Sequence, residues 1–146
     1  MKLRLMLAHA AEVQAGMLYM LGTGWTEIGP APSPFAIAGI IEVPWDETNW
    51  RRKLEIPIED EDGQPLVVAT PAGDQLVKFQ ADFDVGRPPG VAPGRSFNLP
   101  IAINIVPLPL QAGRHYVVKA FIDGELADEV GFSVRQQPGV GQQPPR

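Results

Sequence analysis

The sequence has no cysteine and only two histidines, and these absences exclude several kinds of site. Without a thiol the chain forms no disulfide, no zinc–thiolate site and no cysteine nucleophile. His9 and His115 lie far apart in the sequence, so no His-x-x-x-His pair exists to hold a metal ion. We therefore expect neither a metal nor a cofactor.

Long apolar runs and clusters of positive charge are also lacking. No run approaches the roughly 18 to 20 apolar residues of a membrane span. Residues 1–10 start like an export signal, but Arg4 leaves only a short apolar stretch, which favours a first strand and a cytoplasmic protein. A net charge of −5 opposes contact with nucleic-acid phosphates. We expect no membrane and no nucleic-acid partner.

Catalytic motifs are absent as well. Ser33, Ser96 and Ser133 have no Gly-x-Ser-x-Gly context, and the Gly-x-Gly of residues 22–24 lacks the third glycine of a phosphate loop. The acidic stretch at residues 59–63 does not have the spacing of a calcium loop and is typical of an Asp-Gly turn, although a weak cation site stays open. These observations predict a protein that is not an enzyme.

Proline and glycine are abundant, with 16 and 15 residues, in a chain of 146. This composition favours one domain of short strands with many turns over long helices. Alternating apolar residues predict strands at residues 3–7, 17–28, 35–43, 51–59, 76–85 and 98–106, with two more in 113–134. Residues 8–16 are predicted as a connection, with one helical turn as an option. Pro57 confines its strand to an edge or a bulge.

Residues 136–146 are rich in glutamine, proline and glycine and offer nothing to pack. They are predicted to be a disordered tail, which leaves residues 1–135 as the domain.

Seven or eight short strands separated by turns are typical of a β-sandwich or a barrel. The spacing of Leu110, Gly113 and Tyr116 before a strand resembles the tyrosine corner of Greek-key sandwiches, in which the hydroxyl bonds a backbone group slightly upstream. We therefore predict an all-β, immunoglobulin- or fibronectin-like antiparallel β-sandwich.

The last two strands pose a question of register. Asp123-Gly124 predicts a two-residue turn, and a strict hairpin would then pair Tyr116 with Gly131. The tyrosine corner instead needs Tyr116 in the core opposite Phe132. A β-bulge within residues 126–129, or a three-residue loop, supplies the one-residue shift. We predict the shifted register, which places Val117 and Phe121 on the outer face.

Two groups of residues are candidates for binding. The strand at 35–43 is apolar on both faces, so Ile40 joins Val117 and Phe121 as an outer-face residue. Such a face usually covers a second copy, a partner or loops of the same chain, although scattered surface apolar residues are common. Trp45 and Trp50 bracket a polar loop and are either a second binding site or a cap on the core.

Residues 5–28, 34–45, 58–65 and 103–126 resemble segments of a widespread family of small uncharacterised bacterial proteins, a domain of unknown function, and the resemblance covers nearly the whole chain except the tail. Because the shared motifs are structural, the resemblance implies a fold and no catalytic residues. The sequence predicts a non-catalytic protein-binding or assembly module that self-associates through an outer sheet face. A carbohydrate- or small-ligand-binding module using the tryptophans and an unrecognised enzyme using a histidine with carboxylates are the alternatives.

Overall fold

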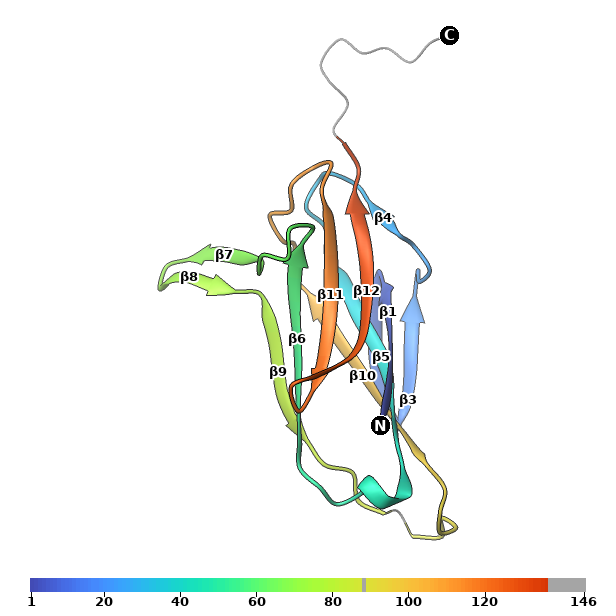
Figure 1. The fold of residues 1–146 in the computed structure, drawn as a ribbon. Coiled ribbons are helices and arrows are strands. Elements are labelled where there is room, and N and C mark those ends of the chain that lie inside the picture. Colours follow the sequence, from blue (N-terminus) through green and yellow to red (C-terminus); the bar gives the residue numbers. More distant parts are fainter. Residues whose placement is uncertain (88, 137–146) are drawn as a thin grey trace, which may run out of the picture.

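A computed structural model describes residues 1–87 and 89–136 as an all-β chain with one short 3-10 helix, η1 (Trp45–Glu47) (Figure 1). No helix among these residues has the length and apolar character needed to cross a membrane. The predicted tail lies, except for Gln136, outside the described residues. The strands are β1 (Lys2–Ala8), β2 (Ala10–Gln14), β3 (Met17–Leu21), β4 (Glu27–Ile28), β5 (Phe35–Val43), β6 (Arg52–Asp60), β7 (Val67–Thr70), β8 (Gly73–Leu76), β9 (Lys78–Phe83), β10 (Phe97–Ile105), β11 (His115–Ile122) and β12 (Glu125–Val134).

Two larger sheets enclose one hydrophobic core. The first has the order β1-β5-β10, and the second, in front of it in Figure 1, has the order β4-β12-β11-β6-β9. Successive side chains of a strand point to opposite faces, so each strand gives alternate residues to the core. Ile37 and Ile41 of β5 thus pack in the same cluster as Ile56, Val118 and Phe132 of the second sheet.

The outer face of the three-stranded sheet is covered in part by a hairpin of the same chain. β2 and β3 pair antiparallel around Ala15-Gly16, whose φ angles of 49° and 73° are those of a tight type I′ turn. Buried alanines lie between this hairpin and the sheet, namely Ala8, Ala11, Ala36 and Ala38. Their small side chains allow the two layers to approach closely. The predictions of a connection at residues 8–16 and of one strand over 17–28 are therefore wrong.

Pro57 does not lie in an edge strand, because β6 sits between β11 and β9. The ladder between β6 and β11 pairs Ile58 with Val118 and Glu55 with Phe121, with no pair assigned between them. Proline has no N–H to donate, so the sheet tolerates it at this interruption of the ladder. The prediction of an edge is wrong.

A further hairpin, formed by β7 and β8, was not predicted. It projects from the second sheet in Figure 1.

The β11–β12 hairpin confirms the shifted register. Its turn has two residues, with Ile122 opposite Glu125, and the register then shifts so that Tyr116 faces Phe132. The one-residue shift is thus made by a β-bulge and not by a three-residue loop. Tyr116 is buried, and its hydroxyl accepts a hydrogen bond from the backbone N–H of Gln111 at 2.9 Å.

Candidate functional site

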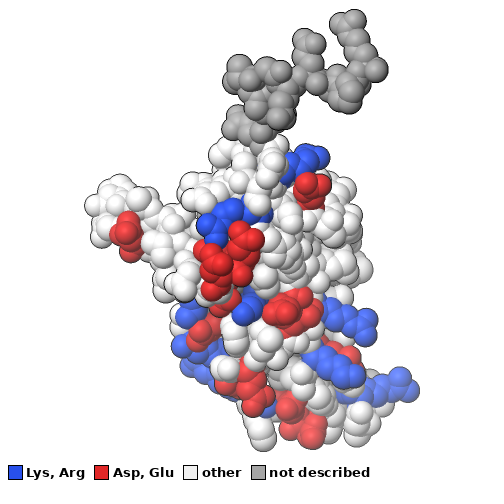
Figure 2. Space-filling model, turned by 45° about the horizontal axis from the view of Figure 1, so that its top comes forward, with Lys and Arg blue, Asp and Glu red and all other residues white. Residues whose placement is uncertain are grey.

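Val117 and Phe121 lie, as predicted, on the outer face of the five-stranded sheet, where both are half-buried. Acidic and basic side chains are interspersed over this side of the molecule (Figure 2). Lys119, between the two apolar residues, pairs with Glu59 at 2.8 Å, and this hydrogen bond raises the pKa of Lys119.

A second ion-paired group borders Phe121. Glu55 lies 2.7 Å from Lys78 and 3.0 Å from Lys53, and the hydrogen bonds from these lysines, Lys78 first, lower the pKa of Glu55. If a second chain covered this face, the side chains of these ion pairs would lose either their partners or their hydration. This face is therefore a poor surface for association.

Ile40 lies on the other side of the molecule. It is on the outer face of β5 in the three-stranded sheet, opposite Arg4 of β1 and Pro100 of β10. The structure thus does not bring Ile40 together with Val117 and Phe121.

The two loop tryptophans have different surroundings. The ring of Trp45 stacks with Phe97, at 6.3 Å between centroids, and the Arg87 guanidinium lies 4.1 Å from the centre of the indole ring. Arg87 also donates from Nε to the Thr48 hydroxyl at 2.8 Å, which joins two loops. Trp45 is therefore engaged in holding this end of the domain together. Trp50 is 59% exposed.

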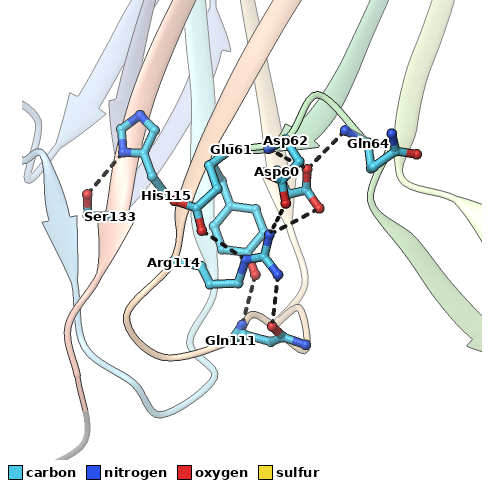
Figure 3. Close-up of polar contacts among 9 residues, drawn as sticks. Asp60, Glu61, Asp62, Gln64, Gln111, Arg114, His115 and Ser133 are labelled. Atoms are coloured by element: carbon cyan, nitrogen blue, oxygen red, sulfur yellow. Dashed lines mark hydrogen bonds and ion pairs between the residues drawn. The ribbon is translucent and has the colours of Figure 1, made fainter.

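The histidines make structural contacts. His9 stacks with Trp25 at 6.0 Å, and His115 Nδ1 lies 3.0 Å from the hydroxyl of its cross-strand neighbour Ser133 (Figure 3). The other side of the His115 ring lies against Gly131, where an added Cβ would be 2.7 Å from Nε2. In residues 1–87 and 89–136 neither imidazole forms an ion pair with an acid, so the Ser133–His115 pair lacks the third member of a hydrolytic triad.

The acidic turn after β6 is closed by an arginine. Arg114 lies 3.5 Å from Asp60, 3.2 Å from Glu61 and 3.0 Å from Asp62 (Figure 3). Desolvation opposes the charge on Arg114, but Asp60 and its acidic neighbours raise the pKa of the guanidinium. The described part of the chain has no group of three or more His, Cys, Asp or Glu side chains suited to a metal ion.

A contiguous apolar surface lies over the β2–β3 hairpin and the adjoining part of the three-stranded sheet. In β3 the alternation turns Leu18 and Met20 inward and leaves three large side chains exposed. We call the exposed set the hairpin surface: Met6, Met17, Tyr19, Leu21 and Ile40, with exposures from 37% to 73%.

Two grooves flank Met20 within this surface. One, of about 270 Å³, lies over β1 and β5 and is lined by Met6, Leu18, Met20 and Ile40, with the charged residues Lys2, Arg4 and Glu42 beside them. The other, of about 610 Å³, is lined by Tyr19, Met20 and Leu21, together with Glu12 and Asn104. The surface thus has an apolar centre, two basic residues and one acidic residue at one groove, and the acidic Glu12 at the other.

The sequence predicted only Ile40 among the residues of this surface. The signal for Met17, Tyr19 and Leu21 was the run Met17–Leu21, which is apolar at five consecutive positions. A strand that is apolar on both faces must be covered on both or must expose one of them.

Residues 3–135 match a family described as "Family of unknown function (DUF6941)". The comparison with curated proteins found no match. Among solved structures, the chain is similar to Pseudomonas fluorescens alkylpurine DNA glycosylase AlkC bound to DNA containing an abasic site analog, at 12% identity and a TM-score of 0.40. That likeness covers 90% of this chain and 30% of the glycosylase chain, and at this degree it indicates neither a shared fold nor a shared activity.

Proposed function

This chain belongs to DUF6941, a family of unknown function, and we propose that it is a non-catalytic protein-binding module that contacts its partner through the hairpin surface. The observation that carries the proposal is the concentration of exposed apolar side chains there. Five of the eleven large apolar side chains exposed in the described residues belong to this surface. Contiguous apolar patches on soluble domains mark sites of interaction.

The residue types suit a protein partner. Tyrosine and methionine are enriched at protein interfaces, and methionine adapts its shape to irregular surfaces. Met20 lines both grooves, so a single binding partner that fills both of them must cross the hairpin. That shape favours an extended protein surface over a small ligand.

The absence of catalytic groupings among the described residues supports a non-catalytic role. His9 and His115 contact an aromatic ring and a serine rather than a carboxylate. The carbohydrate alternative has little support from Trp45, whose ring already contacts Phe97 and Arg87.

We further infer an immunoglobulin- or fibronectin-like sandwich. The two sheets around a shared core and the Tyr116–Gln111 hydrogen bond support this more detailed class. A bacterial origin and a cytoplasmic location stay predictions from the sequence.

Site-specific photo-crosslinking in the cells that make the protein tests the binding proposal. A photoreactive amino acid is placed at Leu21, on the hairpin surface, or at Leu76, which is exposed to a similar extent (73% and 59%) on the β7–β8 hairpin. We expect a defined protein adduct from position 21 and none of that mass from position 76. Identical adducts at the two positions, or no adduct at position 21, would overturn the proposal.

A further inference from the structure

We propose that the partner on the hairpin surface is a second copy of this chain, related by a twofold axis, with Glu12 of each copy facing Arg4 and Lys2 of the other. This inference rests on the proposed function and names the partner of the same surface.

The shape of the hairpin surface is the first argument. In a twofold interface both copies use the same patch, so the patch must carry a projection and a recess that fit each other. Met17, Tyr19 and Leu21 project from the outer side of β3, and the groove below them lies between the inward Leu18 and Met20 and the sheet residues Met6 and Ile40. The projection of one copy can therefore enter the groove of the other while the reverse contact forms at the same time.

The distribution of charge is the second argument. Lys2, Arg4 and Glu42 line the groove that includes Asn98, so this end carries one net positive charge, and Glu12 lines the groove that includes Asn104. Asn98 and Asn104 are six residues apart on β10, so the two ends of the patch are roughly 20 Å apart. A twofold axis over the centre of the patch brings each end against the opposite end of the second copy. The basic end then meets Glu12.

These charged groups are free to pair with another chain. Within residues 1–87 and 89–136, Lys2, Arg4 and Glu12 take part in no ion pair, and all three are exposed. The charges on the outer face of the five-stranded sheet are, by contrast, paired with one another. Self-association is thus assigned to the hairpin surface and not to the Val117–Phe121 face that the sequence predicted.

Light scattering and sedimentation of the purified full chain test the inference. We expect a dimer for the wild type, a monomer for Leu21→Glu, and dimers for the control variants Leu76→Glu and Phe121→Glu, with circular dichroism verifying the fold of each. If Leu21→Glu fails to fold, Met17→Glu near the hairpin turn makes the same comparison. Leu21→Glu and Met17→Glu proteins that both stay dimeric would overturn the choice of surface.

A charge-reversal cycle tests the arrangement of the two copies. We expect Glu12→Arg or Arg4→Glu alone to raise the dimer dissociation constant on the order of tenfold, because like charges then face each other. The double variant should recover most of that loss. Without recovery, the Glu12–Arg4 pairing is wrong. A wild type that is monomeric at every concentration overturns the second-copy inference, whereas an adduct at position 21 with a different protein would still uphold the protein-binding proposal.

Discussion

The carboxylate of Asp128 in β12 accepts a hydrogen bond from the backbone N–H of Leu5 in β1, with 2.8 Å between Oδ2 and the nitrogen. β1 is an edge strand of its sheet, and this N–H points away from its ladder with β5. The bulge places Asp128 opposite Ala120, at a position that faces the core. The one-residue shift therefore turns an acid toward the second sheet and ties the two sheets together.

Replacing Asp128 should destabilise the domain. Asp128→Ala leaves the N–H of Leu5 without this acceptor, and loss of a hydrogen bond to a charged group costs about 1.5–3 kcal/mol. Urea denaturation followed by circular dichroism measures the free energy of unfolding. Glu129→Ala, at the exposed neighbouring position, is the control and should change it by less than about 0.5 kcal/mol. Equal losses in both variants would contradict this role for Asp128.

The stability of the domain depends on Gly22 for two reasons, and a comparison with Gly16 separates them. Its φ is +66°, and an added Cβ would lie 2.3 Å from the His9 ring. Gly16 has a similar φ of +73° with open space around it. Both alanine variants incur the left-handed backbone cost of about 1–2 kcal/mol. Gly22→Ala should lose at least about 1 kcal/mol more, because it also displaces His9 from Trp25. Thermal unfolding and tryptophan fluorescence detect both effects, and equal stabilities for the two variants would show that the His9 contact has no energetic weight.

Tyr116→Phe tests the hydrogen bond that fixes the start of β11. The variant keeps the buried ring and leaves the N–H of Gln111 without its acceptor, so we expect a loss of about 1 kcal/mol. Tyr19→Phe removes a hydroxyl from an exposed ring and should leave the stability of the domain unchanged. The two variants are compared by chemical denaturation under identical conditions. An unaffected Tyr116→Phe variant would mean that the ring alone positions the strand.

Asp123 should make stability depend on acid pH. The backbone N–H of Lys53 and the Arg52 side chain both donate to this carboxylate and lower the pKa of Asp123. A lowered folded-state pKa stabilises the domain above the unfolded-state pKa of about 3.9, and the contribution is lost as the pH falls through the folded value. Asp123→Asn should therefore be less stable than the wild type at neutral pH, by under about 1 kcal/mol at this exposed position.

Denaturation of wild type and Asp123→Asn at a series of pH values measures that difference, and a carbon-13 titration of the Asp123 carboxyl gives its pKa directly. The difference in stability should shrink as the pH falls below 4. A difference that stays constant down to the lowest pH would show that the turn geometry, and not the charge, matters at this position.

The sequence predicted those strands that are apolar over several residues and are bounded by turn residues. β5 was placed at its observed bounds, and the bulge in β12 followed from the conflict between Asp123-Gly124 and Tyr116. At the β11–β12 hairpin the two local signals call for different registers, and the bulge satisfies both. Pro57 was predicted to lie at an edge or a bulge, but β6 is an inner strand and its register with β11 is the same on both sides of the interruption, which is a further way to accommodate a proline.

The candidate site could not be predicted because its hairpin was not recognised. Ala15-Gly16 is a weaker turn signal than Asn-Gly or Asp-Gly, and alanine-rich β2 has only one of the β-branched residues that favour strands, Val13. The run from Met17 to Leu21 shows no alternation, so it does not reveal which side faces outward. Ile40 was identified because β5 is apolar on both faces, but its neighbours on the surface come from β1 and β3.

The buried alanines beneath β2 and β3 also determine how strongly the hairpin is attached to the three-stranded sheet. A methyl group buries little apolar area, so Ala8, Ala36 and Ala38 contribute far less to attachment than the large side chains of the main core contribute to theirs. We therefore expect local opening of the hairpin to cost less free energy than global unfolding, and its amides to exchange with solvent without exposure of Phe132 or Ile37. The proposed binding surface therefore lies on two strands that can open without the rest of the domain, and a bound partner would slow that opening.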